Sequence, residues 1–203
     1  MSETTIDVYS DYKSPYAYLA KDPASTLARS FGLRLNWLPL TLNIPSYLDH
    51  NEARSERNWR KVKYAYMDCR RMANERGLAL YGPKVIYDSR PANVGMLYAQ
   101  AAGEAVFARY HDSVFERFFR RDFNPSDPAV VAAALDAAGA ETGDWPRFLA
   151  GDGGEEHDRI VARAEERGVF GVPTFVWRDE LFFGGDRLTL LRERLTRDLG
   201  EAA

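Results

Sequence analysis

The sequence predicts an α/β fold in which the two ends of the chain build one mixed sheet and the middle is helical. Residues 5–9 alternate as a β-strand does, and residues 15–31 read as a helix that Gly32 closes. An alternating strand over residues 33–38 follows. The connection is long enough for a parallel strand pair joined by a right-handed crossover, so the chain opens β-α-β.

The end of the chain returns to β structure. Residues 173–177 and 181–183 read as two short strands around a turn at 178–180, which predicts a hairpin. The next residues, 184–187, lead into a C-terminal helix with leucines on one face. The chain therefore closes β-β-α.

The middle of the chain carries helical patterns. A buried stripe is expected on a helix over residues 56–77, and loops are expected at 83–91 and 151–154. Further helices are expected at 93–102, 104–123, from Asp127 to Gly139, and at 155–167. Together the three parts outline a thioredoxin-like fold with a large all-helical insertion. We expect residues 1–40 and 169–203 to form the discontinuous thioredoxin-like domain, and 41–168 the insertion.

Composition limits the partners. Hydrophobic residues make up 45% and charged residues 28% of the 203 residues, and the net charge is −3 without a basic stripe, which argues against nucleic acid. The single cysteine, Cys69, excludes an intramolecular disulfide, and the histidines lack metal-ligand spacing. No stretch approaches the roughly 18 apolar residues of a membrane span, and no signal peptide is visible. We expect a cytoplasmic protein with no bound metal.

The first candidate site is the start of the first helix, Ser-Pro-Tyr-Ala at residues 14–17. A Cys-x-x-Cys pair is absent, so the chain has no dithiol exchange of its own. Ser14 instead places a hydroxyl at a helix N-terminus, which favours negative charge. We expect it to donate a hydrogen bond to a bound thiolate and lower the pKa of that thiol. The alternative is a plain helix cap, the commonest use of a serine before proline.

Two motifs near the other end extend the site. A cis peptide before Pro173 would turn the backbone of Val172 toward the first helix, where it could pair with a bound peptide; the alternative is a trans proline that starts a strand. Asp186, after Gly185, could hold the ammonium of a γ-glutamyl group or act as a helix cap.

Five motifs, three of which contain the candidate site residues above, carry a resemblance over nearly the whole chain. They are residues 11–20 (Asp-Tyr-Lys-Ser-Pro-Tyr-Ala-Tyr-Leu-Ala), 61–68 (Lys-x-x-Tyr-x-x-x-Asp), 88–93 (Asp-Ser-Arg-x-x-Asn), 170–175 (Phe-Gly-Val-Pro-Thr-Phe) and 185–188 (Gly-Asp-Arg-Leu). In them the chain resembles the 2-hydroxychromene-2-carboxylate isomerases, relatives of the kappa-class glutathione transferases within the DsbA-like thioredoxin superfamily.

The resemblance implies a fold, a cofactor and an activity. It implies a homodimeric, glutathione-dependent cis–trans isomerase of aromatic catabolites, in which the bound thiolate adds to the substrate and leaves again. A transferase that conjugates electrophiles, and a non-catalytic glutathione- or peptide-binding module, are the alternatives.

The resemblance also assigns roles to residues. Ser14 would contact the glutathione sulfur. The glutathione contacts would be Lys61, Val172, Pro173, Gly185 and Asp186. Tyr87 and Asn93 would line the pocket of the second substrate. The alternative for Lys61 is a solvated helix lysine, which is the commoner use of lysine, and the alternative for Asn93 is a helix cap.

Two departures separate this chain from the pattern. Lys13 stands where these families often carry Phe or Leu, and residues 41–55 match poorly where both ligands should be covered. The second substrate is therefore the least defined part of the expectation.

Overall fold

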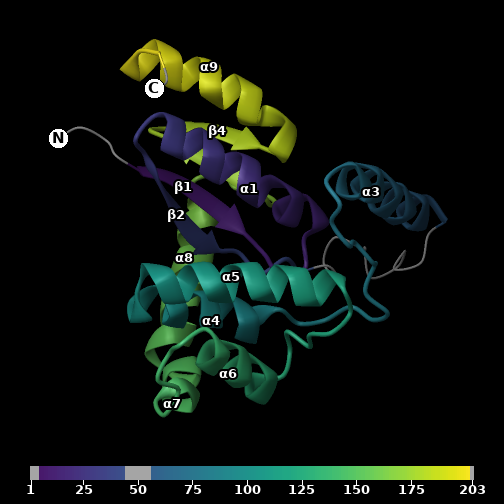
Figure 1. Ribbon diagram of the computed structural model, residues 1–203, viewed down its shortest axis with the longest axis vertical. Helices are drawn as coiled ribbons and strands as arrows, with labels where there is room; N and C mark the ends of the chain where they lie inside the picture. The colour runs from purple at the N-terminus through teal and green to yellow at the C-terminus, as the bar shows by residue number, and fades with distance from the viewer. Residues whose placement is uncertain (1–4, 44–55, 202–203) are drawn as a thin grey trace.

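The computed structural model describes residues 5–43 and 56–201. A four-stranded sheet is built from both ends of the chain: β1 (Thr5–Ser10), β2 (Arg34–Pro39), β3 (Thr174–Trp177) and β4 (Glu180–Phe183). The strand order is β2-β1-β3-β4, with β1 and β2 parallel and the other pairs antiparallel (Figure 1). The predicted mixed sheet is confirmed, and β1 at its centre ends at the candidate site.

Helices cover the sheet on both faces. The first face packs against α1 (Pro15–Ser30) and α9 (Leu188–Leu199), which follows the short 3-10 helix η1 (Gly185–Arg187). The other face packs against α8 (Asp152–Glu166), through Tyr9 and Val176 of the sheet and Ile160 and Ala164 of the helix. Buried apolar side chains on both faces stabilise this layered arrangement.

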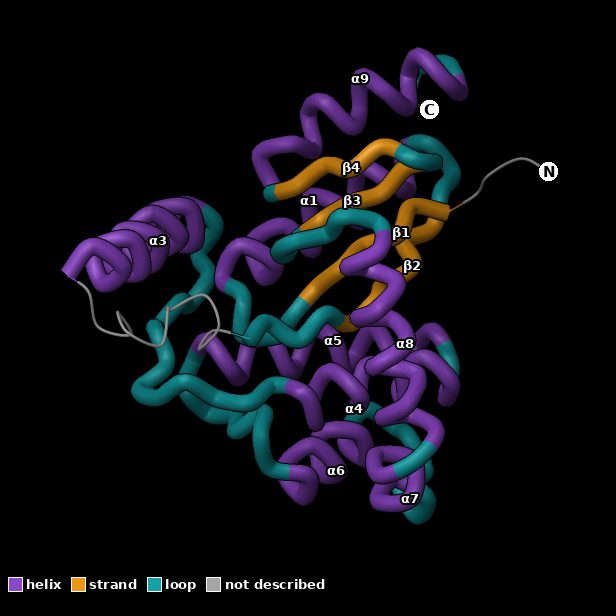
Figure 2. Tube along the Cα trace, turned by 180° about the vertical axis from the view of Figure 1, so that it is seen from behind, coloured by secondary structure: helices purple, strands orange, loops and turns teal. Residues whose placement is uncertain are grey.

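The remaining helices lie between β2 and β3 in the chain. They are α3 (Glu56–Glu75), α4 (Arg90–Ala102), α5 (Glu104–Phe119), α6 (Pro128–Ala137) and α7 (Trp145–Ala150). Figure 2 shows α4, α6 and α7 grouped on one side of the sheet and α3 standing apart. None of the described helices is long and apolar enough to cross a membrane.

The predicted stripe on α3 is only partly buried. Cys69 and Ala73 are fully buried and Tyr66 is half-buried, but Val62 is exposed. The side chain of Trp59 lies outside the described residues. Among the described side chains of α3, from residue 60 onward, burial is confined to the C-terminal half of the helix, where the stripe packs against core residues.

The predicted loop at residues 151–154 is wrong. Asp152 already begins α8, and the short helix α7 directly before it was not expected. The glycines serve close packing instead: a Cβ at Gly153 would overlap the Phe148 ring, and one at Gly154 would lie 2.7 Å from the Leu149 carbonyl oxygen. Paired glycines indicate a loop from local sequence alone, and here the packing of two helices overrides that signal.

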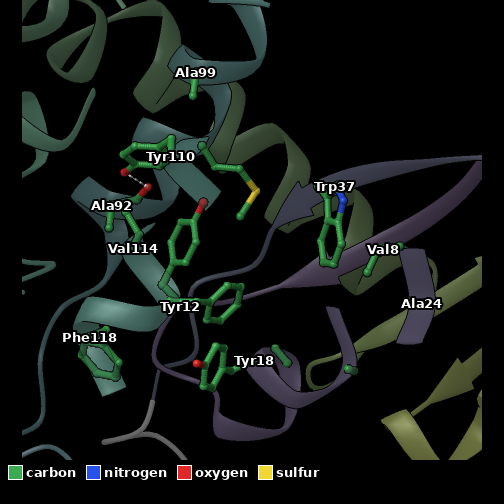
Figure 3. Packing of buried hydrophobic residues seen from close by; sticks show 14 of the residues in the cluster. Val8, Tyr12, Tyr18, Ala24, Trp37, Ala92, Ala99, Tyr110, Val114 and Phe118 are labelled. Carbon is green, nitrogen blue, oxygen red and sulfur yellow. Dashed lines mark hydrogen bonds between the residues drawn. The ribbon is translucent and has the colours of Figure 1, made fainter. Parts of the chain in front are cut away.

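Gly95 of α4 offers a test of the packing between α4 and α5. A Cβ there would overlap the hydroxyl of Tyr110, which is fully buried and donates a 2.9 Å hydrogen bond to the Ala92 carbonyl (Figure 3). We expect Gly95→Ala to lower the free energy of unfolding by about 1–3 kcal/mol, the usual cost of overpacking a core. Gly143→Ala is the matched control, because a Cβ there meets nothing within 4 Å. Equal stability of the two variants in urea denaturation would contradict this account of the interface.

Candidate functional site

Ser14 sits where the two ends of the chain meet. It is the N-cap of α1: its Oγ accepts a 3.2 Å hydrogen bond from the Ala17 N–H, and Pro15 follows as predicted. The same Oγ donates to the Val172 carbonyl oxygen at 3.4 Å, across 158 residues of sequence. Ser14 is therefore a cap and, at the same time, a direct neighbour of the second motif.

Val172 and Pro173 form the facing corner. The Val172–Pro173 peptide bond is cis, which confirms that expectation. The Pro173 carbonyl accepts a 2.9 Å hydrogen bond from the Gly184 N–H, and the Thr174 hydroxyl donates to the Gly171 carbonyl at 2.7 Å. These bonds hold the corner to β3 and to the turn after β4.

The turn after β4 carries Gly185 and Asp186 beside α1. A Cβ on Gly185 would lie 3.2 Å from the Ala20 Cβ, so the absence of a side chain lets this turn approach the helix. The Asp186 side chain is 71% exposed and lies 3.3 Å from the Arg187 guanidinium. Gly184, not Asp186, occupies the N-cap position of η1, and the Asp186 carboxylate is largely exposed to solvent beside α1.

The loop that leads from β1 to Ser14 contains a buried carboxylate, that of Asp11. Asp11 is fully buried at the end of β1, and its Oδ1 accepts from the Lys13 N–H at 3.2 Å. Its Oδ2 accepts from the Leu42 N–H at 2.8 Å and lies 3.7 Å from the Lys13 Nζ. Because the Asp11 carbonyl also accepts from the Ser14 N–H at 2.9 Å, this residue fixes the loop from which α1 starts.

Asn93 belongs to the same buried group. Its Nδ2 donates to Asp11 Oδ1 at 3.2 Å, to Thr41 Oγ1 at 2.8 Å and to Ser89 Oγ at 3.4 Å. Asn93 is fully buried inside the first turns of α4, and Ser89 occupies the cap position. The helix-cap interpretation of Asn93 is therefore wrong. Its side-chain amide instead makes hydrogen bonds within the protein that link α4 to the loop of Asp11.

The polar group extends to α8. His157 is buried, and its Nε2 lies 2.8 Å from Thr41 Oγ1 while its Nδ1 lies 3.1 Å from the Asp158 carboxylate. Asp158 also pairs with Arg90 at 3.0 Å. Burial lowers the pKa of His157, so the ring is neutral near pH 7 and acts as a hydrogen-bonding link.

A model of the DSBA-like thioredoxin domain matches residues 5–196. The chain belongs to the DSBA-like thioredoxin domain family. This confirms the thioredoxin-like fold that the sequence predicts.

Relatives in this family include isomerases. The chain is 31% identical to a 2-hydroxychromene-2-carboxylate isomerase of Pseudomonas putida, over 95% of this chain and 94% of the relative. It is 29% identical to a 2-hydroxychromene-2-carboxylate isomerase of Sphingobium xenophagum, over 94% of this chain and 97% of the relative. A solved structure of a 2-hydroxychromene-2-carboxylate isomerase superposes with a TM-score of 0.77 at 30% identity, covering 95% of both chains. The resemblance stated from the motifs is therefore confirmed.

The fold is shared more widely than the sequence. A probable DsbA oxidoreductase from Streptomyces coelicolor superposes with a TM-score of 0.72 at 16% identity, over 98% of this chain and 91% of the other. This likeness concerns the fold alone. In the present chain the DSBA-like scaffold carries Ser14 at the start of its first helix.

Among the described residues, two predicted site residues make no direct contact with Ser14 or Val172. Lys61 is exposed on α3, and among the described residues no contact joins it to Ser14 or Val172. Tyr87 is half-buried, with its ring 6.0 Å from that of Phe118 and its carbonyl oxygen 3.4 Å from the Lys13 Nζ. Of the poorly matching segment 41–55, residues 44–55 lie outside the described residues.

Cys69 is a packing residue. It is fully buried on α3, and burial raises the pKa of its thiol to about 12. A thiol in that state is not a nucleophile at neutral pH. The thiol chemistry expected at Ser14 therefore requires a thiol from outside the chain.

The sequence analysis missed the buried pair of Asp11 and Lys13. Both residues lie in the motif at 11–20, but neither was considered as a site residue. The signal available was two opposite charges two positions apart in the short connection between a strand and a helix. Charged residues are almost never fully buried unless they are paired, so a charged pair in this setting indicates a structural or functional use.

Proposed function

We propose that this protein is a glutathione-dependent isomerase acting on 2-hydroxychromene-2-carboxylate or a closely related aromatic catabolite. The observation that carries the proposal is the contact between Ser14 and Val172, which places a serine-capped helix start against the cis-proline corner. The activity is taken from the relatives, which carry this isomerase name at about 30% identity over most of both chains.

The donor set fits glutathione. Val172 presents backbone groups at the corner, of the kind that pair with an added peptide strand. Asp186 presents an open carboxylate that suits the γ-glutamyl ammonium, and the bare Gly185 brings this turn close to α1. When bound, glutathione supplies a thiol that adds reversibly to a conjugated carbon, so that the double bond is single while it rotates.

The task of the protein is to favour the thiolate form and to orient both ligands. Ser14 is only 4% exposed, and the 3.4 Å bond from its Oγ to the Val172 carbonyl is longer than the usual O–H···O range of about 2.5–3.0 Å. A thiolate is a stronger acceptor than that distant carbonyl, so the hydroxyl is available to it. The α1 N-terminus adds its partial positive charge, and low solvent exposure strengthens both effects.

Product analysis tests the proposal. Purified protein is mixed with 2-hydroxychromene-2-carboxylate with and without glutathione, and substrate, product and free thiol are followed together. We expect isomerisation only when glutathione is present, with the thiol concentration unchanged at the end. Glutathione consumed in proportion to product would identify a conjugating transferase, and isomerisation at full rate without glutathione would remove the cofactor from the proposal.

A further inference from the structure

Lys13 is an ammonium group buried beside the candidate site. Its side chain is 6% exposed, and it directly precedes Ser14 in the loop between β1 and α1. Its Nζ lies 3.4 Å from the Tyr87 carbonyl oxygen and 3.7 Å from Asp11 Oδ2. The side chain therefore extends from the Ser14 loop toward the loop that precedes α4.

These contacts leave the ammonium under-satisfied. A lysine ammonium has three N–H donors, and hydrogen bonds from nitrogen to oxygen usually measure about 2.7–3.2 Å. The bond to Tyr87 is longer than this, and the distance to Asp11 exceeds hydrogen-bonding range. Burying a cation with so few partners is costly, so the position calls for a further acceptor.

Asp11 is poorly placed to be that acceptor. Its two oxygens already receive the Lys13 N–H, the Leu42 N–H and the Asn93 amide at 2.8–3.2 Å. These donors disperse the negative charge of Asp11 over β1, α4 and the segment after β2. The carboxylate balances the charge of Lys13 at a distance and leaves its donors to another group.

Arg90, the nearby cation of α4, is already occupied. It pairs with Asp158 at 3.0 Å and donates to the Gly154 carbonyl at 3.1 Å. Of the two described cations Lys13 and Arg90, Lys13 is therefore the one whose donors remain available to a small anion. Its Nζ contacts Tyr87 and Asp11, whereas the groups assigned to glutathione are Val172 and Asp186.

We infer that Lys13 binds the carboxylate of the second substrate and selects acidic substrates over neutral ones. This inference rests on the proposed function, since it identifies the group that recognises the acidic end of the substrate at that site. The recognised chemistry is the carboxylate of a small aromatic-derived acid, placed beside the sulfur position by its bond to the residue before Ser14. A hydrogen bond between two charged groups is among the stronger ones that proteins make.

A merely structural lysine makes a different prediction. If Lys13 serves only to neutralise Asp11, replacing it changes stability and leaves the preference between an acid and its ester unchanged. The preference for acid over ester is therefore the readout that separates the two roles.

The experiment measures binding of a non-reacting acid without glutathione. Chromone-2-carboxylate and its methyl ester are titrated by calorimetry into wild type, Lys13→Met and Lys13→Gln. We expect wild type to favour the acid, and both variants to bind the acid about 10- to 100-fold more weakly while the ester is unaffected, as loss of a charged hydrogen bond predicts. Lys21→Met is the matched control, because Lys21 is also largely buried but pairs with Asp22 of α1 and with Asp112 of α5.

Each outcome decides the inference. Equal binding of acid and ester by wild type, or an acid preference that survives in Lys13→Gln, overturns it; absence of any binding by wild type does the same. If the Met variant does not fold, the wild-type comparison and the Gln variant still decide. This titration contains no glutathione, so its result does not depend on the proposed cofactor. A separate titration with glutathione tests the cofactor: a protein that prefers the acid but does not bind glutathione would contradict the proposed function and not the role of Lys13.

Discussion

Replacing Ser14 by alanine is expected to lower kcat/KM for the glutathione-dependent reaction by about 10²–10³-fold, the usual cost of removing one donor that stabilises developing negative charge. The hydroxyl is the side-chain donor at the α1 N-terminus, and it lies 3.4 Å from the Val172 carbonyl. Without it, the pKa of a bound thiol should rise toward its free value of about 8.5. Ultraviolet titration of the glutathione complex measures that pKa, and steady-state kinetics measure the rate.

The controls separate chemistry from capping. Ser14→Ala also removes the Ala17 hydrogen bond, so a loss of about 1 kcal/mol of stability is expected from the cap alone. Asp127→Ala is the matched variant, because Asp127 caps α6 by accepting from the Ala129 N–H at 2.9 Å. Ser14→Thr keeps a hydroxyl and should retain part of the activity. Equal activity of Ser14→Ala and Asp127→Ala would exclude Ser14 from catalysis.

Replacing Asp11 by alanine is expected to lower the free energy of unfolding by about 3–5 kcal/mol, since it removes one partner of a buried charged pair. The change removes the acceptor of the Leu42 N–H and one of the acceptors of the Asn93 amide, and it leaves the Lys13 ammonium buried without a nearby negative charge. Chemical denaturation measures the effect. Because the loop of Asp11 also positions Ser14, activity should fall even at temperatures where the variant is folded.

An exposed ion pair is the control for Asp11. Glu116 and Arg120 are both more than half exposed on α5 and lie 2.8 Å apart. Glu116→Gln should cost less than about 1 kcal/mol, as surface pairs do. If Asp11→Ala is no more destabilising than Glu116→Gln, the buried polar group does not organise the site.

The parts of the site that could be predicted from sequence carry strong local signals. Ser14 precedes a proline at a helix start, which indicates a cap regardless of the rest of the fold. The two ends of the chain read as β-α-β and β-β-α, and that order brings Val172 to Ser14 once the strands pair. The cis form of Pro173 was expected from this surrounding order, since cis is uncommon among X–Pro bonds in general.

The rest depends on contacts between distant segments. Asp11, Thr41, Asn93 and His157 come from four parts of the chain, and nothing near any of them in sequence indicates that they share hydrogen bonds. Asn93 looks like a cap when only its neighbours are considered. For the same reason Gly153 suggested a loop, although its bare Cα accommodates the Phe148 ring inside a pair of helices.

The crystal structure of this protein with glutathione tests the central claim most directly. We predict that the sulfur lies within hydrogen-bonding distance of Ser14 Oγ, with the cysteinyl backbone paired to Val172. Glutathione bound at another place, or a sulfur directed away from Ser14, would contradict it.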